Sequence, residues 1–141
     1  YVMIMTEMVH HARIIPFASD HGAPFSQWTG NSIARWENNT LVISTQNFYP
    51  DYGWRNTSPE MKIEERISWL DENTLDYEFT VDDPNTWAQS WSARLPMSRM
   101  SERIYEFACH EGNHGLAGIL AGWRRWEIEG KNSGSIPSVD D

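Results

Sequence analysis

The residues with the clearest chemical potential lie in the stretch ACHEGNHGL, where His110, Glu111 and His114 match the spacing H-E-x-x-H. On a helix, this spacing presents two imidazoles and a general base to one zinc ion. Such a helix must be continuous, and each glycine in a helix interior costs about 1 kcal/mol. Gly112 separates the two histidines and Gly115 follows the second one. The glycines argue against a zinc helix, and we expect no metal at this motif.

The residues before the motif predict a different local structure. The run RIYEFACHE reads as a strand, which would place His110 at a strand end. Asn113 could then cap a helix that begins near His114 or Gly115, so the two histidines would lie on different elements. We expect Cys109 to be a buried structural thiol. A metal site assembled from several of the five histidines remains an alternative.

Acid–base chemistry is the use of this motif that the residue types favour. Histidine exchanges protons near neutral pH, so His110 is a candidate general acid or base. Three carboxylates could orient it or take a second proton role. They are Glu111, Glu78 and Asp82.

Arginines and tryptophans supply candidate substrate contacts. Arg13 or Arg66 could hold an anionic group, and Asn113 could add a polar contact. Rings that could wall a pocket are Trp28, Trp87 and Trp91. The alternative is that the arginines form ion pairs with glutamates within the fold. The candidates for such pairs are Arg13, Arg35, Arg55 and Arg66 with Glu7, Glu37, Glu65 and Glu78.

Composition limits the functions that are open to the chain. Its 141 residues are enough for one domain with a hydrophobic core, and 13% of them are aromatic. The formal net charge of −9 argues against a nucleic-acid groove, which needs clustered lysine and arginine. No run of 18 apolar residues is present, so we expect no membrane insertion.

Most of the chain reads as short strands separated by turns. The runs YVMIMTE and HARIIPF are apolar and of strand length. SIARWENNTLVISTQNF reads as a hairpin that turns at ENNT, and MKIEERISWLDENTLDYEFTVDD as one that turns at DENT. TWAQSWSARLPM and RIYEFACHE complete six to eight antiparallel strands. We expect a mainly β fold, either a lipocalin-like antiparallel barrel or a β-sandwich.

The end of the chain changes to a helical period. Leu116, Ile119, Leu120, Trp123 and Trp126 recur at helical spacing, which predicts one C-terminal α-helix over about 114–129. We expect residues 1–130 to form a single domain and the polar residues 131–141 to form a flexible tail. The chain opens inside an apparent strand, so we expect the natural protein to have a further N-terminal portion.

Residues that share a strand face can be assigned before the direction of the face is known. Ile63, Glu65 and Ile67 alternate with Glu64 and Arg66. In the next strand, Tyr77, Phe79 and Val81 share a face opposite Glu78, Thr80 and Asp82. The sequence does not show which of these faces turns inward.

Three long motifs carry a resemblance to a known family. RWENNTLVISTQNF, EERISWLDENTLDYEFTVDDPNTW and IYEFACHEGNHGL resemble a family of mostly uncharacterised, often exported bacterial proteins. Its members carry runs like RWEGDTLVV-T-NF, ERF, YEFTVDDP and YEYACHEGNYGL. The family has tyrosine where this chain has His114, so a chemistry shared by the family would not need that histidine. The resemblance implies a periplasmic or secreted location.

These observations lead to two main functional hypotheses. The first is a barrel that binds a small aromatic or amphipathic molecule and acts on it by cofactor-free lyase, hydratase or isomerase chemistry. The second is a non-enzymatic periplasmic module that binds a ligand or a partner subunit, in which case the chain could also form a homo-oligomer. A metal-dependent enzyme that uses histidines is the third.

Overall fold

The structure is a computed structural model of the whole chain, and it describes residues 1–22, 25–50, 56–109, 111–112 and 114–130. Contacts along the chain define two compact units, Tyr1–Tyr105 and Glu106–Asp141. Each unit is described by itself below.

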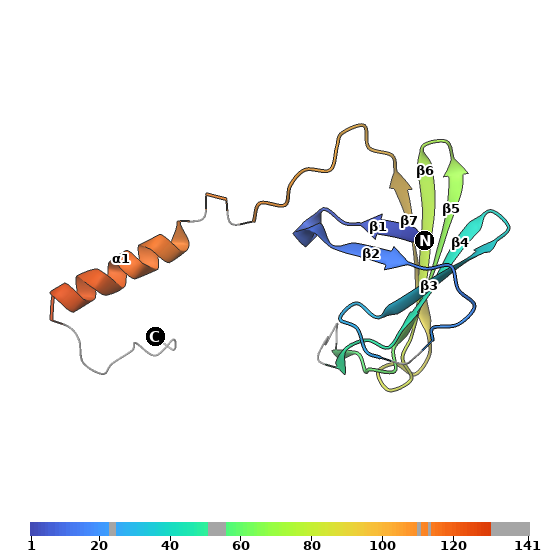
Figure 1. Cartoon of the computed structure of the whole chain (residues 1–141), viewed down its shortest axis with the longest axis horizontal. Coiled ribbons are helices and arrows are strands. Elements are labelled where there is room, and N and C mark those ends of the chain that lie inside the picture. The colour runs from blue at the N-terminus through green and yellow to red at the C-terminus, as the bar shows by residue number, and fades with distance from the viewer. Residues whose placement is uncertain (23–24, 51–55, 110, 113, 131–141) are drawn as a thin grey trace. The chain divides into compact units, whose positions relative to one another are not determined.

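A five-stranded antiparallel sheet dominates the first unit, and its strand order follows the chain (Figure 1). Each strand therefore pairs antiparallel with its neighbour in the sequence. The strands are β3 (Asn31–Glu37), β4 (Thr40–Gln46), β5 (Lys62–Asp71), β6 (Thr74–Asp82) and β7 (Trp91–Ser98). The two predicted hairpins are confirmed, since ENNT joins β3 to β4 and DENT joins β5 to β6.

The turn between β3 and β4 depends on the backbone conformation of an asparagine. Asn38 has φ of +54°, in the left-handed region that asparagine tolerates better than most residues. The turn fixes the register, with Glu37 opposite Thr40 and Ala34 opposite Ile43. Register decides which side chains face the core, because a slip of one residue would exchange the two faces.

A separate two-stranded hairpin precedes the sheet. It consists of β1 (Val2–Met5) and β2 (Ala12–Ile15), joined through the 3-10 turn Met8–His10. In Figure 1 these two strands run at a steep angle to the strands of the larger sheet. Ile15 is fully buried with Ala34, Leu41 and Ile43 of β3 and β4. Burying a side chain of this size stabilises the fold by about 2 kcal/mol.

The face of the sheet that contacts the hairpin is organised in cross-strand rows. One row has Ala34, Ile43, Glu65, Phe79 and Ala93 from β3 to β7. The adjacent row has Ser32, Thr45, Ile63, Val81 and Trp91. Phe48 and Met61 extend this second row into a core cluster with Val81. We call this face the inner face.

The opposite face of the sheet, the outer face, is charged. Arg35 and Arg66 each contact both Glu37 and Glu64, with N–O distances of 2.8 to 3.3 Å. Hydrogen bonds from Arg66 and then Arg35 lower the pKa of the Glu37 carboxyl below its usual value. Side chains this exposed form ion pairs that contribute little to stability.

A buried aspartate organises the loop after β6. Asp83 is 1% exposed and accepts hydrogen bonds from the Ser58 amide at 2.6 Å and the Ser58 hydroxyl at 2.7 Å. The Thr86 hydroxyl donates to the same carboxylate at 2.7 Å. Burial by itself raises the pKa of Asp83, but these donors outweigh burial and the net pKa is lowered.

The second unit contains the helix α1 (Gly115–Ile128), which agrees with the predicted span of about 114–129. His114 is its N-cap residue, and the Trp123 and Trp126 rings meet edge to face at 5.3 Å. Arg125 donates to Glu129 one turn later at 3.1 Å. This helix is too short to span a membrane, and no other described helix is longer.

The structure corrects two details of the sequence interpretation. Residues 103–108 have no regular secondary structure, so the strand predicted at RIYEFACHE is wrong over its described part. Cys109 is exposed, so the prediction of a buried thiol is also wrong. The described strands do not close a barrel, because β3 and β7 are the two edges of the sheet. The single domain over 1–130 stays a prediction, and the tail at 131–141 lies outside the described residues.

Candidate functional site

A cavity of about 300 Å³ lies on the inner face of the sheet. Apolar atoms form most of its surface, from Phe48, Met61, Ile63, Phe79 and Val81. The polar lining comes from both the sheet and the β2 region: His11, Arg13, Thr29, Thr45, Glu65 and Tyr77. Pockets that bind small molecules commonly have such an apolar surface with a few convergent polar groups.

An ion pair crosses from the hairpin to the sheet at this cavity. Arg13 of β2 donates from Nη1 to Glu65 Oε1 at 3.0 Å and from Nη2 to Oε2 at 2.6 Å. Glu65 is only 5% exposed. The two parallel bonds give the forked arrangement in which a guanidinium and a carboxylate pair most strongly.

Two hydroxyls complete the surroundings of the guanidinium. Arg13 Nη2 also donates to Ser32 Oγ at 3.1 Å and to Thr45 Oγ1 at 3.2 Å. These hydroxyls are 2.8 Å apart and bond to one another. The charge of Arg13 is therefore balanced by Glu65, and its Nη2 is held by groups of the protein.

The Tyr77 hydroxyl is tied to the same carboxylate. It donates its only hydrogen to Glu65 Oε1 at 2.9 Å. Burial raises the pKa of Tyr77 strongly, and the Glu65 carboxylate raises it further. The phenol therefore stays protonated at neutral pH, and its oxygen retains the capacity to accept a hydrogen bond.

A series of aromatic contacts continues from the cavity wall. Phe79 lies between Tyr77, at a ring distance of 5.8 Å, and Trp91, at 5.6 Å. Trp91 meets Trp87 edge to face at 5.6 Å. Trp87 and Trp91 thus pack against the core cluster that contains Phe48 and Val81, behind the cavity surface. The structure brings these two predicted residues close to the site as support for its wall.

Other predicted site residues lie away from this cavity. Glu78 is on the outer face, opposite Arg66 of β5 and Arg94 of β7. Arg66 belongs to the charged outer network, and Asp82 is exposed at the end of β6. Among the arginines, the ion-pair alternative is confirmed for Arg13 with Glu65, and for Arg35 and Arg66 with Glu37.

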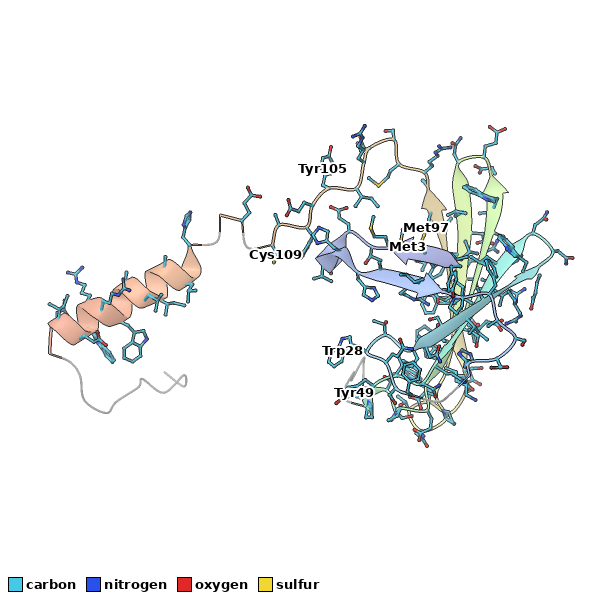
Figure 2. All side chains as sticks on the ribbon, viewed as in Figure 1. Met3, Trp28, Tyr49, Met97, Tyr105 and Cys109 are labelled. Carbon is cyan, nitrogen blue, oxygen red and sulfur yellow. The ribbon has the colours of Figure 1, made fainter. Side chains whose placement is uncertain are left out.

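Trp28 occupies a loop position outside the cavity lining. It is 62% exposed, and its ring lies 5.7 Å from that of Tyr49 (Figure 2). Its neighbour Thr29 does line the cavity. Trp28 is therefore near the site in sequence without forming its wall.

The HEGNH stretch belongs to the second unit. Glu111 is exposed, and Gly112 has φ of +69°, which no helix interior contains. The helix begins only at Gly115, so the described part of the motif is not helical. His110 and Asn113 lie outside the described residues. Within the part of the chain that the structure describes, no three histidine, cysteine or acidic side chains are grouped as metal ligands need.

Sequence reasoning missed the central role of Glu65 and Tyr77. Both were assigned correctly to faces, and a signal for Glu65 was present. It is the acidic residue between Ile63 and Ile67 on an apolar face, just as Arg13 shares its face with Ile15. A positive charge on one apolar face and a negative charge on another predict that the two residues pair with each other in the core.

Comparison of the chain with models of known protein families, with curated proteins and with solved structures finds no match. The cavity and the groups that line it are therefore the features from which a function can be inferred.

Proposed function

We propose that the protein binds a small, mainly apolar organic molecule in the inner-face cavity. The observation that carries this proposal is the cavity itself, about 300 Å³ with a mostly apolar surface and a few buried polar groups. This size is at the lower end of the range for ligand pockets in proteins.

The described polar groups of the cavity favour binding over proton transfer. Arg13 and Tyr77 donate three hydrogen bonds to Glu65, one to Oε2 and two to Oε1. Abstraction of a ligand proton by Glu65 would disrupt these hydrogen bonds. Acid–base chemistry by His110 and Glu111 with Glu78 or Asp82 remains a separate hypothesis, since Glu78 and Asp82 lie away from the cavity.

We also propose that the protein is periplasmic or secreted. The motif resemblance implies export, so the ligand would be met in the periplasm or outside the cell. Binding of an extracellular small molecule needs neither a cofactor nor a membrane anchor.

The uncharged fluorescent probe N-phenyl-1-naphthylamine tests the proposal. We expect saturable binding with a Kd on the order of 100 μM, from about 0.3 kcal/mol per non-hydrogen atom. Ile63→Trp, which would place an indole in the cavity, should weaken binding at least about tenfold.

The matched control is Glu64→Trp, the next residue on β5, whose side chain lies on the outer face. It adds the same indole to the same strand and should leave the probe affinity unchanged. Equal affinities for wild type and Ile63→Trp would contradict binding in this cavity. Chromatography of the recovered probe would show whether the protein changes it chemically.

A further inference from the structure

The hydrogen-bonding pattern of the cavity constrains which ligands fit it, given the proposed binding function. The ion pair of Arg13 and Glu65 is neutral overall, and the Tyr77 hydroxyl that donates to it retains only the capacity to accept. We propose that the cavity selects uncharged aromatic molecules that carry a hydrogen-bond donor, such as phenols, over aromatic carboxylates and ammonium compounds.

Charge balance disfavours an anionic ligand. The bidentate pair of Arg13 and Glu65 neutralises both charges at distances of 3.0 and 2.6 Å. A ligand carboxylate placed near Arg13 would also lie near the negative charge of Glu65. Among the described lining residues, no unpaired cation would compensate for the hydration that the carboxylate loses on binding. This conclusion differs from the expectation that Arg13 holds an anionic group of the substrate.

A cationic ligand meets the opposite difficulty. An ammonium group beside Glu65 would also lie beside the Arg13 guanidinium, which already forms the ion pair. Displacing Arg13 would leave its charge in a site where the side chain is 21% exposed. Breaking a buried ion pair in this way costs more free energy than one new contact between Glu65 and the ligand would provide.

The phenol of Tyr77 specifies a donor on the ligand. Its single hydrogen is committed to Glu65 Oε1 at 2.9 Å, so toward the cavity its oxygen can only accept. The Glu65 carboxylate is also an acceptor only. A ligand hydroxyl or N–H can therefore bond to Tyr77 or Glu65, whereas an ether or ketone oxygen placed against these two groups would face acceptors and lose its water.

Rings provide the remaining selectivity. Phe48, Phe79 and Tyr77 line the cavity, and Phe79 is already held between Tyr77 and Trp91. Flat apolar surfaces and ring edges in fixed positions favour a planar aromatic ligand, through stacked or edge-to-face contacts of about 1 kcal/mol each. A phenol-like molecule satisfies the rings and the acceptor together.

A series of naphthalenes of nearly equal size tests this inference. The probes are 2-naphthol, 2-methoxynaphthalene, 2-naphthoate and 1-naphthylmethylammonium, each titrated calorimetrically at pH 8, where imidazoles are generally neutral. We expect 2-naphthol to bind about fivefold more tightly than 2-methoxynaphthalene, because one buried hydrogen bond is worth about 1 kcal/mol, and at least as much more tightly than the two charged probes.

The outcomes separate this inference from the function on which it rests. Binding of no probe would overturn both the binding function and its selectivity. Equal or tighter binding of 2-naphthoate or of 2-methoxynaphthalene would overturn the selectivity alone and leave the binding function standing. These measurements use the wild-type chain and so do not depend on the folding of a variant.

A variant assigns the preference to Tyr77. Tyr77→Phe keeps the ring and removes the phenol oxygen as an acceptor, so the preference for 2-naphthol over 2-methoxynaphthalene should shrink, with Glu65 Oε1 left as the remaining acceptor. The affinity for 2-methoxynaphthalene should be unchanged. Arg94→Ala, which removes an exposed outer-face ion pair with Asp76, is the control and should alter neither affinity. An undiminished preference for 2-naphthol in folded Tyr77→Phe would overturn the role of the phenol as acceptor.

Discussion

Arg13 and Glu65 form a pair whose location is informative beyond its strength. A buried ion pair is often no more stabilising than apolar residues of the same volume, because both charges lose their hydration. Arg13 shares its strand face with Ile15, and Glu65 shares its strand face with Ile63 and Ile67. An isoleucine in place of either charged residue would fill the space without a loss of hydration. The pair fixes the Tyr77 hydroxyl through Glu65 and so presents an ordered polar patch within an apolar cavity. A ligand site requires such a patch, whereas a core does not.

The buried carboxylate of Asp83 makes the fold sensitive to acid. Its pKa in the folded state is lowered by hydrogen bonds from Ser58 and Thr86, against the opposing effect of burial. A lowered folded pKa gives stability that is present above the unfolded value of about 3.9 and is lost as pH falls through the folded pKa. We expect Asp83→Asn to lower the free energy of unfolding at pH 7 by on the order of 2 kcal/mol.

Urea denaturation at pH 7, 5 and 3 measures this effect. The difference between wild type and Asp83→Asn should shrink toward pH 3, because only the wild type loses a carboxylate there. Asp82→Asn is the matched control, one residue earlier and exposed, and should follow the wild type at each pH. A constant difference across the three pH values would contradict the assigned linkage.

The elements that could be predicted from sequence are those whose signals are local. Alternation and asparagine turns located both hairpins of the sheet, and the helical period located α1 within one or two residues. RIYEFAC alternates equally well but forms no strand, because a strand needs a hydrogen-bonded partner and this segment is paired in neither described sheet. Pairing is a property of the whole fold that alternation in one segment does not contain.

One glycine determines how closely the loop before β3 approaches the sheet. Gly30 has φ of +77°, and a Cβ atom there would lie 2.6 Å from Thr45 Cγ2 and 2.9 Å from Phe48 Cε1. Both neighbours are buried and line the cavity, so neither can move freely. Gly30→Ala should therefore destabilise the protein by about 3 kcal/mol, from backbone strain and overpacking together.

Gly22 provides the control for this substitution. It also has positive φ, +64°, but a Cβ atom there would meet nothing within 4 Å. Gly22→Ala should cost only the strain of the left-handed conformation, about 1 kcal/mol. If thermal or urea unfolding gave equal losses for the two variants, the close packing at Gly30 would be refuted.

At the scale of the molecule, the site was harder to predict than the fold. Arg13 and Glu65 are 52 residues apart, and the cavity combines residues from β2, the loops and three strands. No short motif can encode such a site, whereas HEGNH attracts attention because its residues are contiguous. The net charge of −9 argued against nucleic acid as a partner but carried no information about a cavity in which the charges of Arg13 and Glu65 balance.

The last prediction concerns the independence of the sheet unit. Among the residues that the structure describes, every buried core residue and every residue of the cavity lining lies within Tyr1–Tyr105. A chain ending at Tyr105 should therefore fold, keep the affinity of the full chain for N-phenyl-1-naphthylamine, and unfold in urea with a free energy within about 0.5 kcal/mol of it. Tryptophan fluorescence follows both measurements. A truncated chain that is unfolded or binds the probe more weakly would show that residues 106–141 complete the core or the site, as the single domain predicted over residues 1–130 requires.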